Sequence, residues 1–125
     1  MLFINLLSQN KKNKVTAKEK RLIVYKKCGG HCCYCGKDIE YKDMQVDHMA
    51  PLHKNKNNDI ENLWPACKMC NHYKRGFDLE RFRNLILTLH ERIESNYINK
   101  VGIDFGIITV KPFDGIFYFE KQKQQ

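Results

Sequence analysis

The chain has 125 residues, 42% of them hydrophobic, and its 22 Lys and Arg outnumber its 14 Asp and Glu to give a formal charge of +8. This length suits one small domain with appendages. No apolar run approaches the roughly 20 residues that a membrane-spanning helix needs. The charge favours an anionic partner, most simply nucleic acid, and we expect no membrane partner.

The N-terminal part is predicted to hold a flexible segment followed by a helix. Residues 1–14 join an apolar patch to a polar, basic run, which is typical of a flexible basic segment. They lack the leading positive charges and the cleavage site of a signal peptide, so we expect a cytoplasmic protein. Thr16 and Glu19 form a capping box that begins a helix, and Gly29 and Gly30 end it. The basic residues of this helix face either solvent or phosphates.

The middle of the chain is predicted to contain short elements and then a longer helix. Residues 44–46 favour a strand, residues 53–60 a polar loop, and residues 68–74 a helical turn. Asp78 is expected to cap an amphipathic helix. The apolar residues of that helix recur at helical spacing: Leu79, Phe82, Leu85, Ile86, Leu89 and Ile93.

The last thirty residues change character. Residues 103–110 and 116–119 are rich in strand-forming residues, and Asp114-Gly115 is a strong turn signal. This pattern predicts a C-terminal β-hairpin. The hairpin would either cover the core or offer an edge for dimerisation.

Six cysteines in a cytoplasmic chain indicate a metal site rather than disulfides. Four of them form two C-x-x-C pairs separated by 31 residues: Cys32, Cys35, Cys67 and Cys70. Four thiolates make a closed tetrahedral zinc site, which is structural because it leaves no open position. The zinc would join the two ends of an inserted hairpin. Cys28 and Cys33 fall outside the pattern, although Cys28 could replace Cys32.

Between the cysteine pairs lie residues suited to cutting a phosphodiester bond. That reaction needs a nucleophile and neutralisation of the phosphate charge. His48 suits deprotonation of water, since an imidazole titrates near neutral pH. Asp47 and the amide of Asn71 are hard oxygen ligands for Mg²⁺ or Mn²⁺. Asn62 can hold the hairpin and orient His48. Adjacent strand residues point to opposite faces, so Asp47 and His48 share a site only if the strand ends there, which Pro51 favours.

These motifs resemble the HNH endonuclease family, whose pattern reads roughly D-H-x-x-P, then E-N-L, then C-x-x-C-N-x-x-K. The resemblance covers residues 29–76 and is greatest to the variant with a four-cysteine zinc site. It implies an α+β fold, a small zinc-stapled ββα-metal finger, here with flanking helices and the C-terminal β-hairpin. It also implies His48 as the general base, Asp47 and Asn71 as ligands of the catalytic cation, Asn62 as the central structural asparagine, and Lys74 near the scissile phosphate.

The sequence departs from the family pattern at two points. Asn71 stands where the family name expects histidine, and His72 becomes the ligand if the register is shifted by one. The loop after Pro51 reads HKNKNND where many relatives carry glycines. Its Lys54 and Lys56 contact either DNA or solvent.

We therefore expect a nuclease core at residues 15–77, preceded by the segment 1–14 and followed by a helix and hairpin at residues 78–125. The expected activity is hydrolysis of phosphodiester bonds in DNA by a monomer or homodimer. It needs structural Zn²⁺ and catalytic Mg²⁺ or Mn²⁺, but no small-molecule cofactor. Two alternatives are a non-catalytic zinc-stapled module that binds nucleic acid, and a zinc-stapled protein-interaction module that uses the hairpin.

Overall fold

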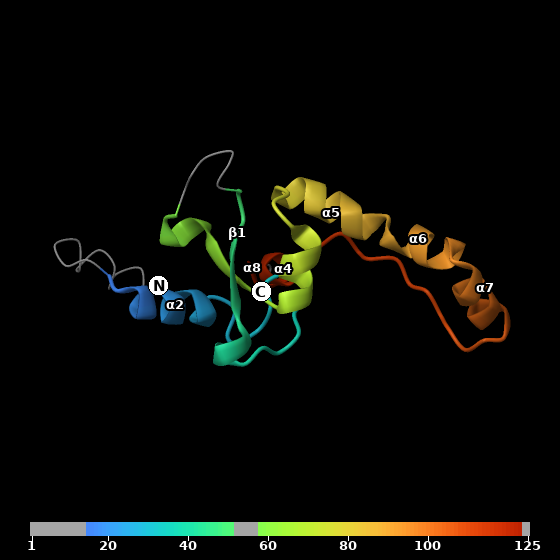
Figure 1. Ribbon diagram of the computed structural model, residues 1–125, viewed down its shortest axis with the longest axis horizontal. Helices are drawn as coiled ribbons and strands as arrows, with labels where there is room; N and C mark the ends of the chain where they lie inside the picture. Colours follow the sequence, from blue (N-terminus) through green and yellow to red (C-terminus); the bar gives the residue numbers. More distant parts are fainter. Residues whose placement is uncertain (1–14, 52–57, 124–125) are drawn as a thin grey trace.

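The computed structural model describes residues 15–51 and 58–123, which form helices around one two-stranded antiparallel sheet (Figure 1). The predicted flexible segment 1–14 and most of the polar loop, with Lys54 and Lys56, lie outside the described residues. The elements in chain order are α2 (Ala17–Lys26), the 3-10 helix η1 (Tyr41–Asp43), β1 (Gln45–His48), the 3-10 helix η2 (Ile60–Asn62), β2 (Leu63–Ala66), α4 (Lys68–Lys74), α5 (Leu79–Leu87), α6 (Leu89–Ser95), α7 (Tyr97–Asp104) and α8 (Tyr118–Lys123). Among the described residues, no helix is both long and apolar enough to cross a membrane.

Helix α2 begins at the predicted capping box. The Thr16 side chain accepts a hydrogen bond from the Glu19 backbone, and the Glu19 carboxylate accepts one from the Thr16 backbone. Both glycines after the helix have positive φ, a conformation that glycine adopts without steric cost. Part of the basic face is used within the protein, because Arg21 donates to two backbone carbonyls near β1 and Lys27 donates to the carbonyl of Leu63.

The hairpin and the helix that follows it form a ββα unit. Strand β1 pairs with β2 so that Asp47 lies opposite Trp64 and His48 lies opposite Leu63. Pro65 is tolerated in β2 because both strands of a two-stranded sheet are edges, where a missing backbone N–H costs little. Helix α4 starts two residues after β2 and packs beside β1. The predicted strand and helical turn are both confirmed, the strand with slightly different bounds.

The core brings together residues 32–35, here called the cysteine loop, with α5 and with the last described residues around α8. Tyr34 meets Phe82 of α5 edge-on at 5.1 Å between ring centroids, and Phe82 stacks on Phe117 at 5.4 Å. Phe117 and Phe119 are both buried. The backbone of Phe119 donates to the carbonyl of Cys33, so the end of the chain binds directly to the cysteine loop.

The predicted amphipathic helix is two helices. Leu79, Phe82, Leu85 and Ile86 pack into or against the core as expected. Helix α5 ends at Leu87 and α6 begins at Leu89 after a break at Thr88, and Ile93 on α6 is exposed. Figure 1 shows α5, α6 and α7 extending in a row away from the core, with the following segment running back alongside them to α8.

The predicted C-terminal β-hairpin is wrong. The described residues contain no strand after β2. The backbone N–H groups of Ile107 and Ile108 instead donate to the carbonyl of Gly102 and close the end of α7. Gly102 also lets Ile108 approach, since a Cβ atom there would lie only 2.7 Å from the Ile108 Cδ1 atom. Two roles were considered for this region, and the structure shows the first of them: Phe117 and Phe119 cover the core.

We expect Glu120→Gln to lower the free energy of unfolding at pH 7 by about 1 kcal/mol. The two carboxylate oxygens of Glu120 accept hydrogen bonds from Arg83 at 2.6 and 2.8 Å, which ties α8 to α5. The Arg83 guanidinium also holds the pKa of Glu120 below its usual range. This contribution is therefore present above the unfolded pKa of about 4.3 and disappears as the pH falls through the lower folded value.

Urea unfolding of both proteins at pH 7 and at pH 3 measures this difference. The gap between wild type and variant should shrink at the lower pH. The exposed Glu94→Gln serves as the control, and a Glu120→Gln protein that unfolds like it at pH 7 would contradict the expectation.

Candidate functional site

Four cysteine sulfurs meet between the cysteine loop and the start of α4. The sulfur atoms of Cys32, Cys35, Cys67 and Cys70 all lie within 4.8 Å of one another. Four sulfurs bound to one zinc at about 2.3 Å are about 3.8 Å apart in a tetrahedron, and the Cys35 and Cys67 sulfurs are 3.9 Å apart. Cys67 also caps α4, because its sulfur accepts a hydrogen bond from the Cys70 backbone. The donor set and its spacing therefore fit a closed, structural zinc site.

The remaining two cysteines are buried thiols next to this cluster. Burial raises the pKa of Cys28 to about 11 and also raises the pKa of Cys33. The cluster includes Cys32, so Cys28 does not replace it. Cys33 has a structural role, because its backbone N–H donates a hydrogen bond to the Pro65 carbonyl and so joins the cysteine loop to β2.

Asp47 lies buried at the contact between β1 and α4. Its Oδ2 atom lies 3.0 Å from the Lys74 Nζ atom and accepts a hydrogen bond from the Tyr34 hydroxyl. Burial raises the pKa of Tyr34, so the hydroxyl keeps the proton that it donates. A buried carboxylate needs such partners, because its desolvation is otherwise costly. Both contacts reach Oδ2, and among the described residues no hydrogen bond or ion pair reaches Oδ1.

Lys74 of α4 contacts two consecutive residues of β1, Asp47 and His48. Its side chain is 1% exposed, and Nζ donates to the His48 carbonyl at 3.0 Å in addition to pairing with Asp47. The ammonium is bound inside the protein, and the expected place of Lys74 near the scissile phosphate stays a prediction. The sequence motif identified the residue but did not show which side of α4 faces the sheet.

His48 is the last residue of β1. The strand therefore ends at the point that would allow the adjacent Asp47 and His48 to share one site. The Nε2 atom of its ring lies 2.8 Å from the amide oxygen of Asn58. An amide oxygen only accepts, so this contact places the ring proton on Nε2 and leaves Nδ1 as the basic nitrogen. Sequence analysis did not single out Asn58, because nothing in the run HKNKNND distinguishes it from its neighbouring asparagines.

Asn62 fastens the segment that follows His48. Its side-chain oxygen accepts from the Ala50 backbone N–H at 2.8 Å, and its side-chain nitrogen donates to the Ala50 carbonyl at 2.9 Å. In addition, the Met49 backbone donates to the Asn62 carbonyl at 3.0 Å. Asn62 thus bridges the two sides of the hairpin directly beside His48.

Asn71 lies half-buried on α4, three residues before Lys74. Side chains three apart share one face of a helix, so Asn71 lies on the face that Lys74 directs to β1. Among the described residues, its amide makes no hydrogen bond and is available to a ligand. His72 is exposed and turned about 100° around the helix from Asn71. Asp47 and Asn71 therefore lie on the two elements, β1 and α4, that Lys74 joins.

Comparisons with known proteins identify the domain in which these residues lie. Residues 32–76 match the family model described as HNH endonuclease, which confirms the resemblance found in the motifs. No curated protein matches the sequence. Five chains of known structure match, among them the one described as "Crystal structure of the Type II-C Cas9 enzyme from Actinomyces naeslundii", at 25% identity and a TM-score of 0.49. The match covers 66% of this chain and 10% of that chain, so this protein spans about a tenth of that enzyme.

We expect Cys67→Ser to lose zinc and unfold, because zinc binding and folding are coupled in sites of this kind. Zinc content per chain and far-ultraviolet circular dichroism measure the two effects. Cys28→Ala is the control, since it removes a buried thiol outside the cluster, and it should keep one zinc per chain. A folded Cys67→Ser protein with full zinc content would refute the four-thiolate site.

We expect Asn62→Ala to lower the free energy of unfolding by about 1–3 kcal/mol, because it leaves the backbone groups of Ala50 without their partners. Asn71→Ala is the matched control, and its effect should stay within about 0.5 kcal/mol, as is usual for partly exposed positions without such contacts. Urea unfolding of the two zinc-loaded variants measures both values. Equal destabilisation by the two substitutions would show that the asparagines do not differ in role.

Proposed function

We propose that the HNH endonuclease domain at residues 32–76 makes this protein a metal-dependent nuclease that hydrolyses phosphodiester bonds in DNA. The observation that carries the proposal is the contact between β1 and α4. There a buried carboxylate, the imidazole that ends the strand and an unpartnered amide lie on the two elements that Lys74 joins. The charge of +8 supports an anionic substrate.

His48 acts as the general base in this proposal. The hydrogen bond from Nε2 to Asn58 orients the ring, so Nδ1 takes a proton from water. The resulting hydroxide attacks the phosphorus atom and forms a new P–O bond. The P–O bond to the departing sugar oxygen breaks, and that oxygen takes a proton from solvent. Asn62 keeps the segment after His48 in place while this occurs.

Asp47 and Asn71 would hold the catalytic cation. The fit rests on their donor atoms, because Asp47 Oδ1 and the Asn71 amide oxygen are hard ligands of the kind that Mg²⁺ and Mn²⁺ prefer. Such a cation, when bound, neutralises the charge that develops on the phosphate. Lys74 is then a positioning residue: it fixes the carboxylate of Asp47 through Oδ2 and the backbone of His48 through its carbonyl.

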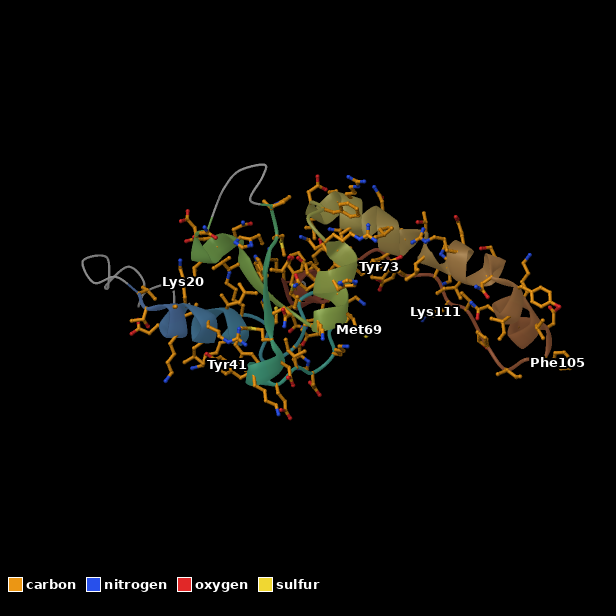
Figure 2. The ribbon with its side chains drawn as sticks, in the orientation of Figure 1. Lys20, Tyr41, Met69, Tyr73, Phe105 and Lys111 are labelled. Atoms are coloured by element: carbon orange, nitrogen blue, oxygen red, sulfur yellow. The ribbon has the colours of Figure 1, made fainter. Side chains whose placement is uncertain are left out.

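The basic helix α2 lies close to this site, which favours the phosphate-contacting interpretation of its lysines. The Nζ atom of Lys20 donates to the backbone carbonyl of Asn58 at 3.3 Å, and the side chain of Asn58 contacts His48. Figure 2 shows Lys20 on α2. Positive charges along α2 would therefore contact the sugar–phosphate backbone of a strand that crosses His48. One site cuts one strand, so a double-strand break needs two copies or two successive events.

We expect His48→Ala to reduce DNA cleavage by at least about 100-fold, the usual contribution of a general base. The dissociation constant for DNA should change by no more than about twofold, because a single neutral ring adds little to phosphate binding. Nicking of a supercoiled plasmid across a series of divalent metals measures cleavage, and fluorescence anisotropy with a labelled duplex measures binding.

His72→Ala is the matched control, because it removes an exposed histidine from α4. It should cut normally, and a loss of cleavage would show that the ligand register is shifted by one. If the wild-type protein binds DNA but cuts no plasmid with Mg²⁺ or Mn²⁺, the alternative of a non-catalytic zinc-stapled binding module replaces the nuclease.

A further inference from the structure

An open pocket of about 480 Å³ lies between α4 and α5, on the C-terminal side of Lys74. Its walls include Tyr73, Arg75, Phe77, Arg81 and Asn84. We propose that this pocket binds one nucleotide of the DNA strand close to the cleaved bond, with its phosphate on Arg75 and its base against Arg81. The proposal rests on the proposed nuclease function and adds a substrate-binding site to it.

The charge of the pocket suits an anion. Among the described residues, the guanidinium groups of Arg75 and Arg81 make no hydrogen bond or ion pair, and none of those that line the pocket is acidic. Arg83, only two residues beyond Arg81, differs because Glu80 and Glu120 both pair with it. Arginine binds phosphate oxygens through two parallel N–H donors. Two arginines without acidic partners therefore leave a local positive charge for a phosphate.

The backbone of Arg75 provides an independent reason to assign a role to its side chain. Arg75 has φ 54° and ψ −138°, and among the described residues it is the only non-glycine with positive φ. A glycine would adopt this conformation without strain, so the turn after α4 does not require arginine. Strained residues of this kind cluster at functional sites. The backbone strain therefore supports a functional role for the Arg75 guanidinium at this position.

The opposite part of the pocket suits a base. The Arg81 guanidinium lies over the Phe77 ring, 3.9 Å from its centroid, so a cationic and an aromatic group lie together in the pocket wall. Nucleic-acid bases stack on guanidinium planes and aromatic rings. Tyr73 lies where α4 approaches α5 (Figure 2), and its hydroxyl accepts a hydrogen bond from Arg92. The amide of Asn84 supplies both a donor and an acceptor for a base edge.

The pocket also lies at the right place for a neighbouring nucleotide. Arg75 follows Lys74 directly, so their Cα atoms are about 3.8 Å apart, and Lys74 Nζ is 3.0 Å from the carboxylate of Asp47. A strand cut beside Asp47 would therefore have nucleotides near the cut on the side of α4 where the pocket lies.

Arg75→Gly tests the phosphate contact, in the full-length, zinc-loaded His48→Ala protein so that the DNA stays intact. We expect the melting temperature to stay the same or rise, because glycine relieves the strain. The dissociation constant for a labelled duplex should increase at least fivefold. Lys111→Gln removes the same charge from an exposed position on the segment after α7, and it should change binding by less than twofold.

Three results would contradict the proposed contact between Arg75 and a phosphate. Arg75→Gly protein that binds as tightly as its parent excludes a contact between Arg75 and DNA. Equal weakening by Lys111→Gln shows that net charge alone matters and excludes a specific site. A lower melting temperature for Arg75→Gly contradicts the inferred strain, and with it the argument that the turn does not need arginine.

An abasic scan tests the base contact. Single abasic sites are placed in turn along one strand of the duplex, and binding is compared between the His48→Ala protein and the same protein with Arg81→Ala. We expect one position at which loss of the base weakens binding about tenfold, an effect that Arg81→Ala removes. If no position depends on Arg81, the pocket holds no base. If an RNA duplex shows the same position with equal affinity, the assignment to DNA is wrong.

These measurements separate the pocket from the proposed function. They use uncut DNA, so they give a result even if the wild-type protein cuts no plasmid and the nuclease proposal fails. Conversely, normal plasmid nicking together with unchanged binding by Arg75→Gly rejects the pocket and leaves the nuclease proposal intact. Where wild-type cleavage occurs, the Arg81-dependent position must lie within the same turn of the duplex as the mapped cut, and a more distant position overturns the assignment.

Discussion

The structure depends on the four thiolates that hold the cysteine loop against the start of α4. A sheet of two strands, each four residues long, is at best marginally stable alone. Zinc bound to Cys32, Cys35, Cys67 and Cys70 would fix the helix to the hairpin at its N-terminal end. This fixed start determines which residues of α4 face β1, and in particular it directs Lys74 to Asp47.

The pair between Lys74 and Asp47 is better explained by positioning than by stability. Buried ion pairs often contribute little net stability, because desolvation of both charges offsets their attraction. This pair instead defines the site: one carboxylate oxygen is held by Lys74 and Tyr34, and the other remains for a ligand. A carboxylate shared in this way is rigid before any ligand arrives. Rigid placement of catalytic groups is what lowers the cost of reaching the transition state.

Local patterns in the sequence were sufficient for the elements that depend on local contacts. The capping box of α2, both cysteine pairs and helix α4 were all predicted from short motifs. The C-terminal hairpin was predicted wrongly, because the strand-forming Ile107 and Ile108 close the end of α7 by hydrogen bonds to Gly102, while Phe117 and Phe119 pack into the core rather than into a strand pair. The buried state of Lys74 was missed for a similar reason, since spacing along the chain does not show which face of a helix is covered.

Phe117 and Phe119 lie well beyond the segment that matches the HNH family, yet they complete the core around Tyr34, the residue that donates to Asp47. A ribosome adds these rings after the matched segment. The growing chain therefore has its thiolates and its histidine before it has the aromatic layer that packs around Tyr34. A fragment that stops at residue 76 contains the whole matched segment but lacks these aromatic contacts.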